Sequence, residues 1–293
     1  MDGVLVLDKP AGWTSHDAVN KVRRIAKLKK VGHLGTLDPM ATGVLPLVVG
    51  KATRLAQFYT KAEKIYQGEV RFGWSTDTYD REGEPTSPVA EYPPDRKLLE
   101  SYLSRFRGTF LQTPPPVSAK KVGGRPAYEF ARKQIAVELA PVEVTVHALN
   151  LLSLEGSCAT LYIHCSAGTY VRGIAHDIGQ LFGCGAHLIA LRRLQSGPFT
   201  LGQAHEMAEV ERLATEGNLQ HLVIGGSKLL PEFPAQEVDD LTAGQIRHGR
   251  DFRTSPFTGD SEARFVKAIG HDGELIAIGE ARLPFLYHPI LVL

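Results

Sequence analysis

The stretch GHLGTLDPMATGVLP, residues 32–46, decides how this chain is interpreted. It contains three glycines, two prolines and one acidic residue, Asp38, and it follows a segment that carries six positive charges. An Asp-Pro pair is typical of a turn, or of a helix start in which the aspartate is the N-cap. The same carboxylate is a candidate nucleophile, because an aspartate is ionised at neutral pH and needs no base partner.

Regular elements are predicted on both sides of this stretch. Residues 3–7 are apolar and predict a strand. Thr14 and Asp17 fit a capping box, which predicts a helix that ends near Lys30. The apolar run at 43–50 predicts a buried strand.

Farther along the chain, a short helix is expected from about Thr53. The alternation at 65–74 predicts a strand whose apolar face carries Tyr66. The elements expected next, in chain order, are a helix at 97–106, a long basic loop rich in Pro and Gly at 108–126, a helix at 126–133, and strands at 142–149 and 159–168.

Thr169 is predicted to cap a helix whose first turn contains Arg172. The buried stripe expected for this helix is Val171, Ile174, Ala175, Ile178 and Leu181. A cation in the first turn opposes the helix dipole at a cost of about 0.3–1 kcal/mol. The position is favourable if a phosphate or a carboxylate such as Asp38 lies opposite, because a guanidinium binds either with two parallel bonds. A solvent-exposed arginine is the alternative.

The C-terminal part differs in pattern. Residues 225–237 mix Gly, Pro and polar side chains and predict a domain boundary. Beyond it, short strands alternate with turns, and His271-Asp272-Gly273 indicates a hairpin. A chain of 293 residues is long enough for two domains, so a small β-rich module is expected at its end.

Composition and missing motifs exclude several classes of protein. Hydrophobic content of 43% and charged content of 22% are ordinary for a soluble globular protein. No run approaches the ~18 apolar residues of a membrane span, and neither a signal peptide nor a Walker, dinucleotide, G-x-S-x-G or H-E-x-x-H motif is evident. Three cysteines indicate reduced thiols of a cytosolic protein, and Cys184 with His187 lacks the spacing of a four-ligand zinc site.

Positive charge is clustered although the net charge is only +1. One cluster without acidic residues comprises Lys21, Arg23, Arg24, Lys27, Lys29 and Lys30. A second, with Glu129 as its one acid, comprises Lys120, Lys121, Arg125, Arg132 and Lys133. Such patches suit a polyanion held in a defined place, and solvated helix faces are the alternative interpretation.

Two further groups have both a structural and a functional interpretation. Tyr66 can stack on a nucleic-acid base or fill the core, and the same holds for Tyr170 and His33. An acidic turn can hold a cation, although turn and cap roles are favoured; it consists of Asp77, Asp80 and Glu82.

Taken in order, seven motifs resemble the TruB family of tRNA pseudouridine synthases. They are KPAGWTS, GHLGTLDPMATGVLPL, GKATRLAQFY, KIYQGEVRFGWSTDTYDREG, QTPPPVSAKKVGGRPAYEFAR, SAGTYVRGIAHDIG and GCGAHLIALRRLQSGPF. The resemblance implies an α+β fold with a mixed, largely antiparallel central sheet flanked by helices. It further implies a catalytic domain at 1–230, with a basic RNA-contacting insertion at 108–135, and a PUA-like RNA-binding domain at 236–293.

The activity implied by the resemblance is isomerisation of one uridine, position 55 in the T-loop of transfer RNA, to pseudouridine. The base is flipped out, detached from its sugar at N1 and rejoined through C5. This needs no redox cofactor, ATP or metal. A carboxylate can add to the pyrimidine ring, add to the sugar C1′, or remove a sugar proton to give a glycal, and the sequence does not choose among these routes.

Residue roles follow from the same resemblance. Asp38 matches the catalytic aspartate, Arg172 the arginine that pairs with it, and Tyr66 the tyrosine that packs on the base. The remaining expected site residues contact the substrate or support the site; they are His33, Tyr170, Leu191, Lys9 with Pro10, and Asp80. The segment around Gln134 and Ala140 departs from the family pattern, because it lacks an expected glycine and arginine.

Three other functions remain open. A glycosidase-like hydrolase would pair Asp38 with a second carboxylate such as Asp80. A non-catalytic protein would bind and remodel transfer RNA, and a guide-RNA-dependent synthase belongs to the same family. The basic insertion favours a stand-alone enzyme, so we expect a cytoplasmic monomer that binds the T-arm and needs no protein partner, membrane or cofactor.

Overall fold

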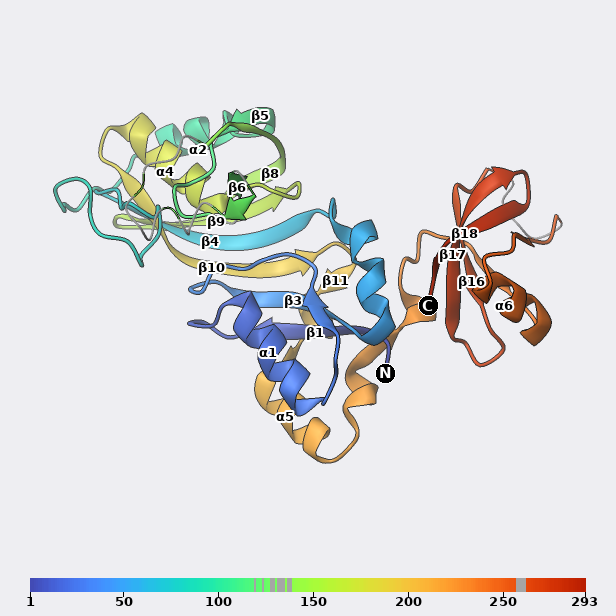
Figure 1. Cartoon of the computed structure of the whole chain (residues 1–293). Helices are drawn as coiled ribbons and strands as arrows, with labels where there is room; N and C mark the ends of the chain where they lie inside the picture. The colour runs from blue at the N-terminus through green and yellow to red at the C-terminus, as the bar shows by residue number, and fades with distance from the viewer. Residues whose placement is uncertain (119, 123, 127–129, 131–134, 136–138, 257–261) are drawn as a thin grey trace.

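The computed structural model describes residues 1–118, 120–122, 124–126, 130, 135, 139–256 and 262–293. Its large sheet has eleven strands (Figure 1). They are β1 (Gly3–Lys9), β2 (Val31–His33), β3 (Thr42–Val49), β4 (Lys64–Phe72), β5 (Gly108–Gln112), β8 (Val142–Glu155), β9 (Cys158–Cys165), β10 (Ala186–Ser196), β11 (Phe199–Thr200), β12 (His205–Glu206) and β13 (Val223–Gly225).

A smaller sheet near the C-terminus has five strands. They are β14 (Ala235–Glu237), β15 (Phe252–Arg253), β16 (Phe265–Ile269), β17 (Leu275–Leu283) and β18 (Leu286–Val292). The strands β6 (Lys121–Val122) and β7 (Arg125–Pro126) form a separate hairpin. The α-helices of the described residues are α1 (Ser15–Ile25), α2 (Arg96–Ser104), α4 (Val171–Phe182), α5 (Met207–Thr215) and α6 (Asp240–Arg247).

The main path of the large sheet runs β12-β1-β3-β10-β4-β9-β8-β5. Among the described strands of this sheet, β1 pairs in parallel with β12 and β3 with β10, and the other pairs are antiparallel. Figure 1 shows α1, α2, α4 and α5 around this sheet and the smaller sheet as a separate red lobe with α6. The predicted α+β class with a mixed, largely antiparallel sheet is therefore confirmed.

The two faces of the central strands are both buried. On β1, Leu5 and Leu7 pack into a core that includes Ala18 and Val22 of α1. The alternate residues of β1 pack into a second core with the 3₁₀ segment η1 (Gly50–Tyr59) and with Leu275 of β17. Because both faces are covered, residues 4–7 of the strand are all apolar rather than alternating. The second core also joins the smaller sheet to the large one.

The capping box predicted for the first helix is present. Asp17 N donates to Thr14 Oγ1 at 3.0 Å, and Thr14 N donates to Asp17 Oδ2 at 2.9 Å. The predicted end near Lys30 is wrong, since α1 ends at Ile25. Lys27 takes a left-handed conformation with φ 53°, and a residue in that conformation ends a helix.

Three other local expectations are corrected. The predicted loop at 108–126 begins with β5, which pairs with β8 about thirty residues downstream, a partner that local sequence does not reveal. The short helix expected from Thr53 is the 3₁₀ segment η1 and starts earlier. The cap of α4 is Tyr170 rather than Thr169, and Gln112 supplies the hydrogen bonds, accepting from Tyr170 N and donating to Tyr170 O at 2.9 Å each.

The remaining expectations differ in outcome. The hairpin at 271–273 joins β16 to β17 and is confirmed. In the stripe predicted for α4, Leu181 is exposed and the other four residues are buried. Four residues named above lie outside the described residues: Glu129, Arg132, Lys133 and Gln134. The same holds for most of the helix predicted at 126–133. The domain limits at 230 and 236 stay predictions. In the described part of the chain, no helix is long and apolar enough to cross a membrane.

Candidate active site

Asp38 lies in a turn that leads into β3. Ala41 N donates to Asp38 O at 3.1 Å, and β3 begins one residue later. The turn interpretation is confirmed and the helix-cap interpretation is wrong, because the following residues pair with β1 instead of coiling. The Asp38 side chain is 33% exposed, so it stays accessible to a ligand.

Lys9 fixes this turn from behind. Its ammonium is buried and donates to Pro10 O, Trp13 O and Pro39 O at 2.9, 2.7 and 3.2 Å. Burial lowers the pKa of Lys9 to about 8, although the nearby Asp38 carboxylate opposes the shift. Lys9 therefore ties the loop after β1 to the Asp38–Pro39 turn, and it supports the site rather than facing a substrate.

Arg172 is the second residue of α4 and is almost fully buried. Its Nη2 lies 3.0 Å from Asp38 Oδ1 and its Nε lies 2.9 Å from Asp38 Oδ2. The guanidinium also donates to Thr78 O at 2.9 Å and to Val117 O at 3.0 Å. The hydrogen bond from Nη2 orients the carboxylate, and the close Nε contact adds to the ion pair that balances its charge, which explains a cation in the first turn of a helix.

Asp80 lies on the other side of this arginine. Its Oδ2 is 3.3 Å from Arg172 Nη1, while its Oδ1 accepts from Thr78 Oγ1 at 2.6 Å and from Glu82 N at 3.0 Å. The side chain is buried and does not belong to the lining of the adjacent cavity. Asp80 was expected to contact substrate, but the structure places it behind Arg172, where it fixes the guanidinium between two carboxylates.

A cavity of about 270 Å³ opens in front of Asp38. The predicted residues among those that line it are Asp38, Tyr66, Tyr170, Arg172 and Leu191. The size lies just below the range of roughly 300–1,000 Å³ of small-molecule sites. His33, on β2, is not among the lining residues, and its Nδ1 accepts from Gly35 N at 3.3 Å; burial lowers its pKa.

The pairing of β4 with β10 builds the floor of this cavity. Tyr66 lies opposite Arg193 in the register, and Leu191 lies opposite Gly68. Tyr66 is buried on the inward face of β4, as its alternation predicts. Burial raises the pKa of its phenol, and the positive charge of Arg193 partly opposes that shift. The phenol is therefore neutral at neutral pH and keeps its proton.

Two buried cations in the lining were not predicted. Arg193 is 1% exposed and donates to Val44 O, Gly35 O and Thr36 O at 2.7, 3.1 and 3.3 Å. Lys64 is also buried, and burial together with Arg193 lowers its pKa. No carboxylate of the described residues forms an ion pair with either cation, although buried charges are normally paired.

This unpaired positive charge points to an anionic ligand. The sequence carried one signal for it, since Lys64 shares the otherwise apolar face of its strand with Tyr66. A cavity that combines a carboxylate oriented by arginine, a tyrosine ring and unpaired cations is suited to chemistry on an anionic substrate that carries a flat ring, such as a nucleotide.

Comparisons with known proteins specify this class. A family model described as TruB family pseudouridylate synthase (N terminal domain) matches residues 23–171, and one described as tRNA pseudouridylate synthase B C-terminal domain matches residues 172–225. The chain belongs to the TruB family of pseudouridylate synthases. The family predicted from the seven motifs is thus confirmed, together with its enzyme class.

Several relatives align along most of the chain. The tRNA pseudouridine synthase B of Solibacter usitatus is 62% identical over 100% of both chains. The proteins of the same name from Pseudomonas paraeruginosa and Bacillus licheniformis are each 42% identical, over 96% and 86% of this chain and 92% and 84% of their own. A solved Cbf5-Nop10-Gar1 complex contains a chain of similar fold, with a TM-score of 0.69, 27% identity, and coverage of 97% of this chain and 79% of that one.

Proposed function

We propose that this protein converts uridine 55 in the T-loop of transfer RNA to pseudouridine, with Asp38 as the nucleophile. The observation that carries the proposal is the side-on pair between Asp38 and Arg172 at the wall of the cavity that holds Tyr66. The relatives that align along most of the chain are named tRNA pseudouridine synthase B, which supports transfer RNA as the substrate class.

The reaction exchanges one glycosidic bond for another. The N1–C1′ bond breaks, the base turns, and a C5–C1′ bond forms; the proton at C5 leaves and N1 gains one, so atoms and electrons balance without a cofactor. Asp38 can serve by adding to the ring, by adding to C1′, or by removing a sugar proton, and each route needs the carboxylate held toward the nucleoside. Arg172 provides that orientation, and Asp80 fixes Arg172.

The cavity walls account for the rest of the nucleotide. A uridine in a folded loop must be unstacked at a cost of a few kcal/mol. The ring of Tyr66 and the side chains of Tyr170 and Leu191 offer the flipped base new contacts. In this proposal Lys64 and Arg193 face the phosphate of that nucleotide, which would neutralise their unpaired charge.

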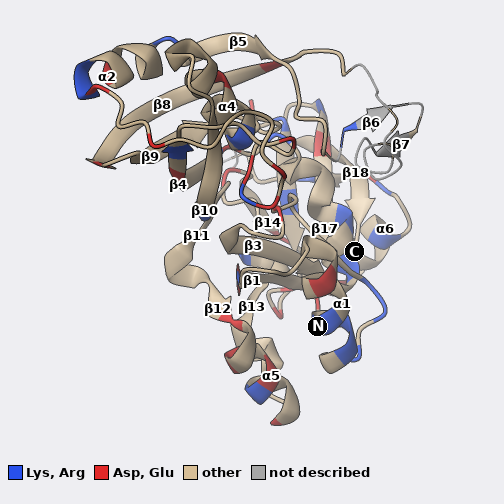
Figure 2. Ribbon diagram, turned by 90° about the vertical axis from the view of Figure 1, so that its left-hand side faces the viewer, with Lys and Arg blue, Asp and Glu red and all other residues tan. Residues whose placement is uncertain are grey.

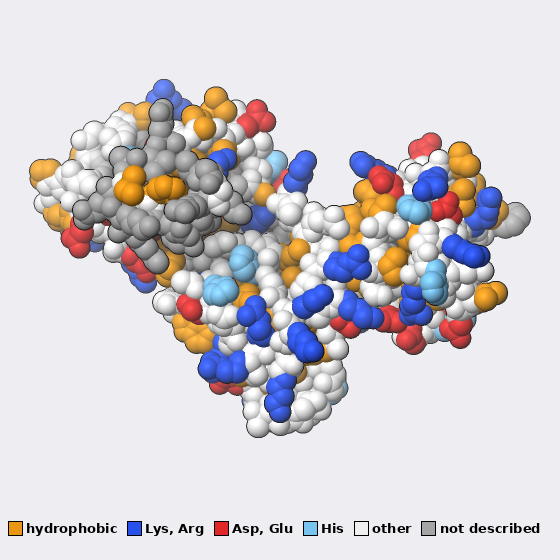
Figure 3. Space-filling model, viewed as in Figure 1, with side chains coloured by type: hydrophobic (Ala, Val, Ile, Leu, Met, Phe, Trp, Pro, Cys, Tyr) orange, Lys and Arg blue, Asp and Glu red, His pale blue; other side chains and the backbone are white. Residues whose placement is uncertain are grey.

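A second feature supports RNA as the substrate. A groove of about 730 Å³ runs where the two sheets meet, and its positive lining residues are Lys29, Lys30, Lys51, Arg54 and Arg247, with Asp2 as the acidic one. Figure 3 shows Lys and Arg side chains gathered between the left-hand lobe and the C-terminal lobe, and Figure 2 shows positive residues along α1 and the loop after it. Phosphates along this groove would release counterions and strengthen binding.

In this proposal the remaining parts hold the RNA. Residues 236–293 form a PUA-like RNA-binding domain, and the insertion at 108–135 contacts the T-arm. The enzyme acts in the cytoplasm as a monomer, without a protein partner or cofactor.

The test is conversion of an unmodified T-arm hairpin by the purified chain with nothing added. We expect a product of unchanged mass and release of tritium from a uridine labelled at C5. Free uracil would show a hydrolase instead. Conversion that appears only after a guide RNA is added would identify the guide-dependent branch, and tight binding without conversion would identify a non-catalytic protein.

A further inference from the structure

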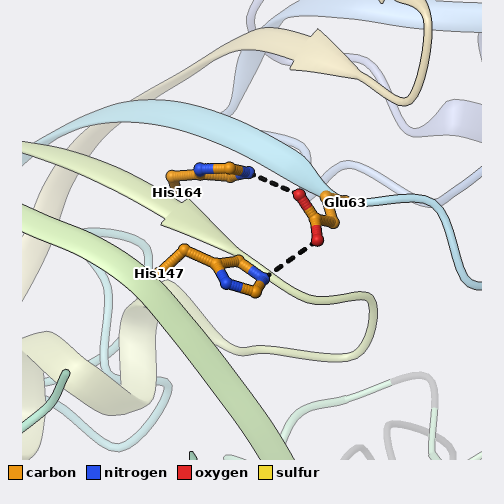
Figure 4. Close-up of side chains that lie close together, drawn as sticks. All are labelled: Glu63, His147 and His164. Carbon is orange, nitrogen blue, oxygen red and sulfur yellow. Dashed lines mark hydrogen bonds and ion pairs between the residues drawn. The ribbon is translucent and has the colours of Figure 1, made fainter. Parts of the chain in front are cut away.

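Two histidines and a glutamate converge outside the cavity (Figure 4). Glu63 immediately precedes β4, while His147 lies on β8 and His164 on β9. Glu63 Oε1 is 3.0 Å from His147 Nε2, and Glu63 Oε2 is 2.7 Å from His164 Nε2. The pairing of β9 with both of its neighbours brings the three residues together, since His164 lies opposite Ile65 on β4 and opposite Ala148 on β8.

The geometry suits a metal ion. All three ligand atoms lie within 4.8 Å of one another, and this is the one such group of His, Cys, Asp and Glu among the residues that the structure describes. Neighbouring ligands of a tetrahedral zinc ion lie roughly 3.3–3.5 Å apart, since each bond is about 2.0–2.2 Å long. The side chains are 30–51% exposed, so they have room for the small outward shift that an ion requires.

We propose that Glu63, His147 and His164 bind one divalent transition-metal ion, Zn²⁺ in the first instance. Two imidazoles and a carboxylate are a donor set that zinc accepts, and water would occupy the fourth position. The competing explanation is that one carboxylate simply accepts hydrogen bonds from two rings.

The position of the site gives the ion a structural role. None of the three side chains belongs to the described lining of the cavity. Lys64, next to Glu63, and Ser166, two residues after His164, do belong to it. An ion here would join β4, β8 and β9 at the edge of the cavity without entering the proposed reaction. The inference does not depend on the proposed function.

The test is metal binding by the full chain, measured by calorimetry with Zn²⁺ and by visible absorption with Co²⁺. We expect one ion per chain, the intense Co²⁺ absorption of a four-coordinate site, and a higher melting temperature with Zn²⁺. His147→Ala, His164→Ala and Glu63→Gln should each weaken binding at least tenfold and remove the gain in melting temperature.

The matched control is His205→Ala. His205 also pairs with a glutamate, Glu209, at 3.0 Å, but without a second histidine in the described residues. The His205→Ala protein should bind Zn²⁺ as the parent does. Equal affinity in the His147→Ala and His164→Ala proteins, or no binding by the parent chain, would overturn the proposal and leave the hydrogen-bonded cluster as the explanation.

Discussion

The cavity and the groove between the two sheets both carry positive charge, but they hold it differently. Arg172 and Arg193 at the cavity are 4% and 1% exposed, and each guanidinium has several partners at fixed positions. At the groove, the Lys51 and Arg247 side chains are 55% and 46% exposed, and each forms an ion pair with Glu274. Buried cations can therefore orient reacting groups, whereas exposed ones contribute attraction that salt screens.

The sharpest way to break this comparison is Asp38→Asn. The change keeps the shape of the side chain and removes the charge that faces Arg172. We expect conversion of a T-arm hairpin to fall by at least ~10⁴-fold while RNA affinity stays near that of the parent. Single-turnover conversion and filter binding measure the two quantities. Asp77→Asn, in a turn outside the cavity lining, is the control, and unchanged conversion by Asp38→Asn would refute the nucleophile.

Asp80→Asn tests whether Asp80 contributes to activity only by holding Arg172 in position. It keeps an acceptor for Thr78 Oγ1 and Glu82 N but removes the ion pair with Arg172. A shift of the Asp38–Arg172 pair by ~1 Å would lower kcat by ~10²-fold, with little change in RNA affinity. Partial recovery in Asp80→Glu would support a positioning role, and the exposed Glu84→Gln serves as the control. A loss confined to affinity would contradict this interpretation.

For the groove we expect the opposite pattern, in which RNA affinity changes and kcat does not. Replacing both Lys29 and Lys30 with alanine removes exposed charge from its lining. Each lost phosphate contact should reduce the slope of log affinity against log salt by ~0.7–0.9, and kcat at saturating RNA should not change. The charge-matched control is the Arg96→Ala, Lys97→Ala protein, altered on α2. An unaltered salt slope would mean that this part of the groove does not meet phosphate.

The last expected effect is on stability rather than on activity or RNA affinity, namely the pH dependence caused by Lys9. Its pKa falls from 10.5 in the unfolded chain to about 8 in the folded protein, so between these pH values the unfolded chain binds more protons. Stability contributed by this group should therefore rise as pH increases from 8 to 10.5, and should not vary below pH 8. Urea unfolding should show this rise in the parent and in Lys97→Met, but not in Lys9→Met. Parallel curves for all three proteins would exclude the buried titration.

The fold was predictable where local pattern and burial agree. The capping box of Thr14 and Asp17 forms as predicted, because its partners lie three residues apart. The Gln112 cap of Tyr170 was not predictable, because its partners lie 58 residues apart. The same distance problem hid β5, whose partner strand begins at Val142.

The site residues likewise divide into those that the sequence predicted and those whose positions only the structure revealed. From the sequence, Asp38 and Arg172 were chemically suited to each other, and the family resemblance paired them; the structure then brings them into contact across 134 residues. Asp80 was expected to contact a substrate, but tertiary packing places it behind Arg172. Lys9 was expected to contact the substrate or support the site, and its ammonium lies behind the Asp38–Pro39 turn. Lys64 left one signal in the sequence, on the apolar face of its strand, whereas Arg193 became visible only through its burial.

By itself, the sequence determined the family and the α+β class and singled out Asp38 as the candidate carboxylate, because motif order, strand alternation and the chemistry of an aspartate are properties of the chain. Only the tertiary structure decided which charges meet. It placed Arg172 between Asp38 and Asp80, left Arg193 and Lys64 without a carboxylate among the described residues, and gathered Glu63, just before β4, with His147 and His164 from two other strands. Electrostatic interactions depend on distance and burial, and strand pairing sets both between residues far apart in the sequence.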